Sequence, residues 1–216
     1  MSSYHKFLFI LLSLILLWLS GLAARVGIAN LRYSAGEHFY TAAIQSEDAQ
    51  KSRDLLKRAY SAMKIANTLD SGNSSYQLQS ARISFALDRL FSPDTMPGLF
   101  YPQAKMHLAS GLKRSPTRAD LWTEYAKISF EKEGATRDTL VALDRALKFG
   151  PKESPTLMVN AAVTLYFWGE LDPDRQKEAW MLVLDAMEDW RLAKEINKIA
   201  RQTGWYKQLQ RSLRER

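Results

Sequence analysis

The strongest constraint on the fold of this sequence is an uncharged, leucine-rich stretch that runs from Phe7 to Ala24. A helix rises about 1.5 Å per residue, so about 20 apolar residues cross the roughly 30 Å hydrocarbon core of a bilayer. The stretch nearly reaches this length. Residues 26–29 extend it if the long side chain of Arg25 reaches the headgroups. The sequence therefore predicts an N-terminal transmembrane helix.

Two other interpretations of this stretch stay open. In a cleaved signal peptide, Gly21, Leu22 and Ala23 would provide the cleavage site. In a soluble protein, the stretch would be a buried core helix. The uncharged run is longer than the roughly 7–15 residues of a signal-peptide core, and this favours a retained anchor.

The orientation of the anchor is only weakly encoded. Lys6 precedes the stretch, whereas Arg25 and Arg32 follow it, so the charge difference that sets topology is nearly balanced. The short N-terminal tail resembles that of a signal-anchor. We therefore expect a single-pass protein of a bacterial inner membrane, with the larger domain in the periplasm.

The composition indicates no catalytic chemistry. The chain has 216 residues and no cysteine, which excludes disulfides, thiolate metal sites and a cysteine nucleophile. The histidines, His5, His38 and His107, do not have metal-ligand spacing, and no nucleophile elbow or phosphate-binding glycine loop occurs. The sequence therefore predicts a protein that is not an enzyme and needs no cofactor.

The net charge of +7 is concentrated near the C-terminus. Residues 191–216 carry eight basic side chains and two acidic ones. A basic face attracts anionic lipid or an acidic polymer. Nucleic acid is not expected as a partner, because a membrane anchor precedes the domain.

Helical periodicity dominates the chain after the anchor, and no alternating strand pattern occurs. Proline and glycine between residues 92 and 102 predict a loop, and Gly72 is expected to end a helix in the left-handed conformation. Ser154 and Asp172, each followed by proline, are expected to cap helices. The predicted helices cover residues 30–45, 50–68, 76–91, 103–114, 119–133, 136–149, 154–168, 172–187, 191–202 and 205–213.

Prolines 116 and 151 each follow a helix, and the residues between them carry a spaced pattern of aromatic and small side chains. The pattern is formed by Trp122, Phe130, Gly134, Ala142, Ala146 and Pro151. Residues 117–151 thereby resemble a tetratricopeptide repeat (TPR), a unit of about 34 residues. Residues 155–187, 30–70 and 73–116 resemble weaker units. The resemblance implies an all-α fold, in which an N-terminal transmembrane helix precedes a TPR-like α-solenoid of stacked helical hairpins.

The resulting domain prediction is an anchor at residues 1–29, a repeat domain at 30–190 and a basic helical tail or cap at 191–216. The resemblance also implies a concave surface that binds a protein segment. The positions expected to line that surface are Glu124, Ile128, Glu131, Val159, Val163 and Tyr166.

The layout resembles small anchored repeat proteins that accompany bacterial polysaccharide assembly, for exopolysaccharide or O-antigen. That resemblance implies a non-catalytic scaffold for an envelope protein partner. Two alternatives stay open: an assembly factor or chaperone of another membrane complex, and a glycan-acting envelope enzyme. The enzyme would require a deep cleft holding a buried carboxylate beside aromatic side chains.

Overall fold

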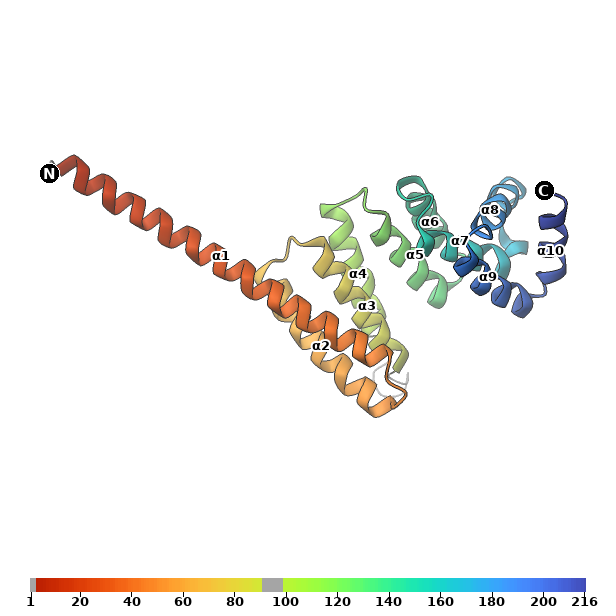
Figure 1. Ribbon diagram of the computed structural model, residues 1–216, viewed down its shortest axis with the longest axis horizontal. Coiled ribbons are helices and arrows are strands. Elements are labelled where there is room, and N and C mark those ends of the chain that lie inside the picture. Colours follow the sequence, from red (N-terminus) through yellow and green to blue (C-terminus); the bar gives the residue numbers. More distant parts are fainter. Residues whose placement is uncertain (1–2, 91–98) are drawn as a thin grey trace. The chain divides into compact units, whose positions relative to one another are not determined.

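A computed structural model describes residues 3–90 and 99–216, and this part of the chain is helical without strands (Figure 1). The α-helices are α1 (Ser3–Ile44), α2 (Ala49–Leu69), α3 (Ser74–Leu90), α4 (Phe100–Arg114), α5 (Ala119–Glu133), α6 (Arg137–Phe149), α7 (Ser154–Tyr166), α8 (Pro173–Ala186), α9 (Trp190–Thr203) and α10 (Tyr206–Arg214). A short 3₁₀ helix, η1 (Trp168–Glu170), follows α7. The all-α prediction is confirmed for the described residues.

The helices form two compact units, Met1–Arg114 (unit 1) and Ser115–Arg216 (unit 2). The first contains α1–α4 and the second α5–α10. The predicted boundary at residues 29/30 lies inside helix α1. The predicted boundary at 190/191 lies at the start of helix α9, which begins at Trp190.

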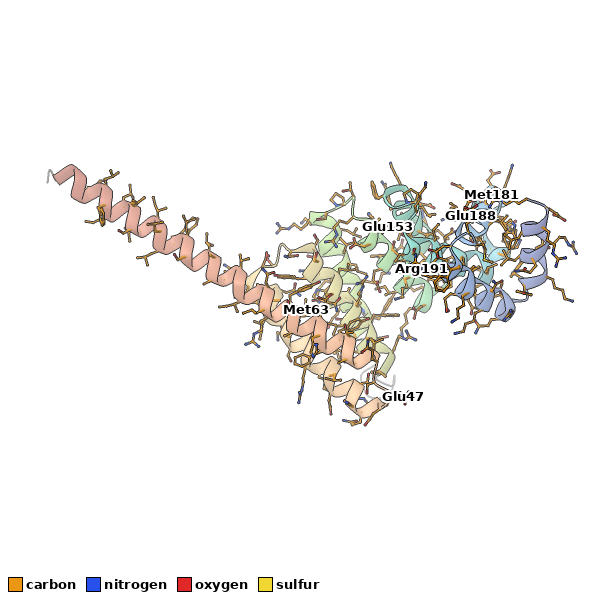
Figure 2. The ribbon with its side chains drawn as sticks, viewed as in Figure 1. Glu47, Met63, Glu153, Met181, Glu188 and Arg191 are labelled. Atoms are coloured by element: carbon orange, nitrogen blue, oxygen red, sulfur yellow. The ribbon has the colours of Figure 1, made fainter. Side chains whose placement is uncertain are left out.

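In unit 1, α1 and α2 form a close antiparallel hairpin, and α2 lies along the C-terminal half of α1 (Figure 1). Small side chains let the two backbones approach, and the spacing of seven residues keeps them on one helix face. We call these buried positions the small-residue seam: Ala29, Gly36 and Ala43 on α1, with Ser52, Ala59 and Ala66 on α2. A side chain at Gly36 would bring its Cβ to 2.8 Å from the sulfur of Met63, which Figure 2 labels on α2.

Polar groups fix the seam hairpin at the turn between α1 and α2. At this turn, Ser52 donates its hydroxyl to the carbonyl of Ala43 at 2.9 Å. The carboxylate of Asp48 accepts from the backbone N–H groups of Gln50 and Lys51, which caps α2. The turn between α1 and α2 therefore has a fixed register.

The end of α2 differs from the sequence prediction. Gly72 does not adopt the left-handed conformation, and positive φ among the described residues occurs at Gly134 and Gly204. Asp70 ends the helix instead, with its N–H bonded to the carbonyl of Ala66 at 2.9 Å. The prediction for Gly72 was wrong because a polar residue two positions earlier already stops the helix.

The predicted loop at 92–102 is only partly described, since residues 91–98 lie outside the described residues. Its last part is helical, because α4 begins at Phe100 and places Pro102 in its first turn, where no intrahelical N–H is needed. The backbone N–H of Tyr101 instead bonds to the carboxylate of Asp88 at 3.1 Å.

Unit 2 has two hydrophobic clusters. The first joins α5, α6 and α7 through buried residues that include Ala126, Leu143 and Val163. The second joins α7 to α8, α9 and α10 and includes Leu165, Val183 and Ile196. The basic tail thus covers a core with its apolar face and presents its charged residues to solvent.

Two predicted helix starts in unit 2 have different outcomes. Asp172 caps α8, and its carboxylate accepts from the N–H of Arg175 at 2.9 Å. Ser154 is already helical, and the residue before it, Glu153, makes no capping side-chain bond. The Ser154 prediction was therefore wrong by one position.

The turn after α6 yields a packing prediction. A Cβ at Gly150 would lie 2.6 Å from the Cβ of Ala119, which is fixed to the backbone at the start of α5. We expect Gly150→Ala to lower the free energy of unfolding by about 1–3 kcal/mol, because α5 must move. Gly169→Ala is the control, since nothing lies within 4 Å of its added Cβ. Denaturant unfolding measures both, and equal stabilities would contradict the packing of this turn against α5.

Candidate functional site: the apolar helix and its junction with unit 1

The first half of α1 presents apolar side chains on every side. Its large residues from Phe7 to Leu19 are 44–70% exposed, and none of the most apolar window is buried against the rest of the chain. The helix is long and apolar enough to cross a membrane. A continuous apolar surface of this extent is unusual for a helix that stays in water.

One face of α1 becomes buried where the helix meets α2 and α3, while other positions such as Leu31 stay exposed. Val26 and Ile28 are 48% and 49% exposed, whereas Ala29 is 0% exposed. The hydroxyl of Tyr76 on α3 donates to the Asn30 side-chain oxygen at 2.5 Å. The ring of Tyr76 also stacks on Tyr33, with a centroid distance of 5.0 Å. Helix α1 therefore passes from its apolar half into a packed core within about one turn.

The environment of Tyr76 keeps its hydroxyl protonated. Burial raises the pKa of Tyr76 above its ordinary value, and the nearby Asp70 and Tyr33 raise it further. The hydroxyl thus remains a donor to Asn30 over the whole physiological range. The tie between α1 and α3 is therefore insensitive to pH in that range.

Arg25 forms a second tie at this junction. Its Nε donates to the carbonyl of Leu69, the last residue of α2, at 2.6 Å. Carbonyls at a helix C-terminus lack intrahelical partners, and a cation there also complements the helix dipole. The sequence predicts a side chain that extends to the headgroups, whereas the structure shows that Arg25 also anchors α2 to α1.

Together these contacts leave no linker between the apolar segment and unit 1. Helix α1 is unbroken from Ser3 to Ile44. From Arg25 to Ala29 the helix rises about 6 Å. The packed unit therefore begins within about one turn of the end of the uncharged stretch.

The predicted partner-binding positions on α5 are distributed between the interior and the surface. Ile128 is 0% exposed and Glu124 is 6% exposed. The Glu124 carboxylate lies 3.4 Å from the ammonium of Lys127. Glu131 is exposed. Of the three predicted α5 positions, Glu131 is therefore the exposed one.

The predicted positions on α7 show the same distribution. Val159 and Val163 belong to the cluster that joins α5, α6 and α7. Tyr166 is 50% exposed, and its hydroxyl donates to the side-chain oxygen of Gln202 at 3.1 Å. Phe130 on α5 packs beside Tyr166, with a centroid distance of 6.2 Å. Tyr166 is thus the α7 position of the three that is open to a partner.

The residues that carry the repeat resemblance lie within unit 2. Ala142 and Ala146 are buried, and Phe130 packs edge-on against Phe167. Gly134 has a φ of 79° and ends α5. Trp122 donates its indole N–H to the carbonyl of Pro116 at 2.8 Å. Pro151 directly follows Gly150, the C-cap residue of α6.

Surface grooves lie within each unit, and two of them are defined by their lining residues. In unit 2, a groove of about 550 Å³ is lined by residues of α6, α7 and α8, and Arg175 crosses it to pair with Asp144. In unit 1, a groove of about 320 Å³ lies over α2, α3 and α4 and includes Tyr60, Asn67 and His107. Both are shallow features of helix packing, and their polar groups largely bond within the protein.

The histidines and tryptophans differ in burial, and Trp190 is 76% exposed. His38 is exposed, and the side chain of His5 lies outside the described residues. Trp168, Trp180 and Trp205 form one aromatic cluster with centroid distances of 5.0–5.9 Å. Among the described residues, no group of three or more acidic or histidine side chains could hold a metal ion.

Comparison with family models, curated proteins and solved structures finds no match for this chain. The class that the structure defines is therefore stated from its own features: an all-helical chain whose first helix is long and apolar enough to cross a membrane.

The junction yields a prediction about coupling. We expect Tyr76→Phe and Asn30→Ala each to lower the unfolding free energy by about 0.5–1.5 kcal/mol, because each removes one partner of a partly buried hydrogen bond. The double variant should lose less than the sum, because both substitutions remove the same bond. Denaturant unfolding in detergent gives the unfolding free energies of the unsubstituted chain, the two single variants and the double variant. Strict additivity would contradict the Tyr76–Asn30 contact.

His107 yields a prediction about pH. Burial lowers the pKa of His107 below 6.5, and its Nδ1 lies 2.7 Å from the Gln77 side-chain oxygen. The unfolded chain therefore takes up this proton first as pH falls, so His107 contributes stability above pH 6.5 that is lost as pH falls through the folded-state pKa. We expect His107→Gln, which keeps an N–H donor, to lose less stability between about pH 7.5 and about pH 5. Thermal unfolding at several pH values measures both proteins. An equal loss of stability in the variant and in the unsubstituted chain would contradict this prediction.

Proposed function

We propose that this protein is a single-pass membrane protein whose helical domain is a non-catalytic scaffold for a protein partner. The observation that carries the proposal is the continuity of α1. Its exposed apolar half runs without a break into the small-residue seam and the contacts at Asn30 and Arg25. A removable tag needs no such contacts, whereas an anchor that holds a domain at a membrane benefits from them.

We propose that the helices after the anchor form TPR-like hairpins. The support is that contacts are most extensive between helices consecutive in the chain, α1 with α2, α3 with α4, and α5 with α6. In unit 2, α5 also contacts α7, as equivalent first helices do in stacked repeats. Buried small residues such as Ala142 and Ala146 suit this close packing.

The proposed binding surface in unit 2 is centred on Tyr166 and Glu131. Both are exposed and lie near the C-terminal ends of α7 and α5, the two helices that contact each other. An exposed tyrosine beside aromatic Phe130 offers a rigid apolar surface with a polar tip, which is favourable at protein interfaces. The partner is a protein of the same membrane or of the adjoining compartment.

The proposed location is a bacterial inner membrane, with the domain in the periplasm. The nearly balanced charges beside the span do not oppose this orientation, since large domains translocate largely regardless of charge. The proposed pathway is the assembly or export of an envelope polysaccharide, and its support is the resemblance of layout to accessory proteins of such systems.

Site-specific photocrosslinking tests the scaffold. A photoreactive residue replaces Tyr166 or Glu131 in full-length protein expressed in bacterial cells. The control position is Met181, which is 46% exposed on α8 and is labelled in Figure 2. We expect adducts with a membrane or envelope protein from Tyr166 and Glu131, and none from Met181.

The electrophoresis gels that resolve the crosslinked adducts also test whether the anchor is retained. We expect the chain in the membrane fraction to keep its full mass of 24.7 kDa. A mature chain that begins after Ala23 would contradict a retained anchor, and equal adducts from all three positions would contradict a specific partner surface. A reporter fused to the C-terminus that is active in the cytoplasm would contradict the periplasmic placement.

A further inference from the structure

One end of the α1–α4 bundle lies next to the apolar half of α1 and carries several basic side chains. It comprises Arg25 on α1, the turn between α2 and α3, and the last turn of α4 with Lys113 and Arg114. The Arg25 bond to Leu69 places the end of α2 at the level where the uncharged stretch stops. We call this set of residues the membrane-facing end.

The last turn of α4 is tied to the same level. A terminal guanidinium nitrogen of Arg114 lies 3.6 Å from the position that a Cβ on Gly72 would take, so Arg114 extends over the α2–α3 turn. His107, two turns earlier on α4, bonds to Gln77 on α3, which fixes the register of these antiparallel helices. Arg114 and Lys113 therefore lie at the same end of the unit as Leu69.

Helix geometry sets the distance of this end from the hydrocarbon core. If the span begins at Phe7, about 20 residues bring α1 across the core at about Val26. The headgroup layer adds only about 5–7 Å on each side of the core. Since Ala29 is already buried in the seam, the membrane-facing end lies within the headgroup layer.

The charges at this end favour anionic phospholipids. Arg25, Lys113 and Arg114 are exposed cations, and the one carboxylate of the turn is Asp70. The Arg25 bond to Leu69 uses Nε, and its two terminal nitrogens are not part of that bond. Basic side chains near a bilayer surface gain about 1 kcal/mol each from anionic headgroups.

We propose that the membrane-facing end binds anionic phospholipid headgroups through Arg25, Lys113 and Arg114. The proposal rests on the proposed anchoring by α1. Bound in this way, unit 1 is held upright on the bilayer by three ties to lipid in addition to its helix. This surface is distinct from the basic face of α9 and α10, which belongs to unit 2.

The absence of cysteine from the sequence allows a direct test in nanodiscs. A single fluorophore is attached at Ser71→Cys, in the α2–α3 turn, or at Glu47→Cys, which lies in the turn at the opposite end of the seam hairpin (Figure 2). The quenchers are phosphatidylglycerol and phosphatidylcholine that carry a nitroxide at the same acyl position and are present at the same mole fraction.

We expect the fluorophore at position 71 to be quenched more strongly by phosphatidylglycerol than by phosphatidylcholine, and the fluorophore at 47 to be quenched by neither. The double variant Lys113→Gln/Arg114→Gln should bring the two quenchers close to equality, since each lost cation weakens the preference about fivefold. The variant Lys51→Gln/Arg58→Gln is the charge-matched control on α2 and should keep the difference.

Three results separate the possible failures. Equal quenching at position 71 by the two lipids would overturn anionic-lipid binding, and so would a double variant that behaves like the unsubstituted chain. Equal quenching at positions 71 and 47 would overturn the placement of this end at the bilayer. A chain that does not co-purify with nanodiscs would instead overturn the anchoring itself.

Discussion

The structure of unit 1 depends on the close contact of α1 and α2 along the small-residue seam. At Gly36 an added Cβ would lie 2.8 Å from the sulfur of Met63 and 3.4 Å from the carbonyl oxygen of Ala59, so the two helices approach closely there. The close approach allows Arg25 to reach the carbonyl of Leu69 and Asn30 to reach Tyr76. Without the seam, the apolar half of α1 would be joined to the rest of the chain by a helix free to swing.

In the proposed anchoring, this arrangement solves a specific problem of a helix that leaves a bilayer. The C-terminal carbonyls of α2 would then end close to the bilayer surface, where water is scarce and an unsatisfied carbonyl is costly. Arg25 satisfies one of them with a charged donor, and such bonds are stronger than neutral ones. The same side chain therefore ends the apolar segment and completes the helix packed beside it.

The sequence predicts local structure better than contacts, and particular residues show why. Helices around residues 119–133 and 136–149 follow from spacing, caps and glycines whose effects act over one turn. Gly72 and Ser154 failed as markers, because Asp70 and Glu153 already occupy the terminal positions. Local signals compete within one or two residues, and propensity does not decide between them.

The junction could not be predicted in the same way, because Arg25 and Leu69 are 44 residues apart. One signal was present in the sequence: alanine, glycine and alanine at 29, 36 and 43 recur every seven residues. That spacing indicates a close helix contact but does not name the partner helix. Of the predicted partner-binding positions, Val159 and Val163 face a core, because helix periodicity alone does not tell which face a neighbouring helix covers.

A rigid junction also changes what tethering achieves for a scaffold. A flexible linker raises the effective concentration of a domain but leaves its orientation to be fixed when a partner binds. With α1 continuous into the seam, unit 1 loses that orientational freedom during folding, so the membrane partner proposed above would meet a surface already oriented. This saving in orientational freedom applies only to partners whose binding site lies at a matching height above the bilayer. In such a protein, selectivity can come from height and orientation as much as from side-chain chemistry.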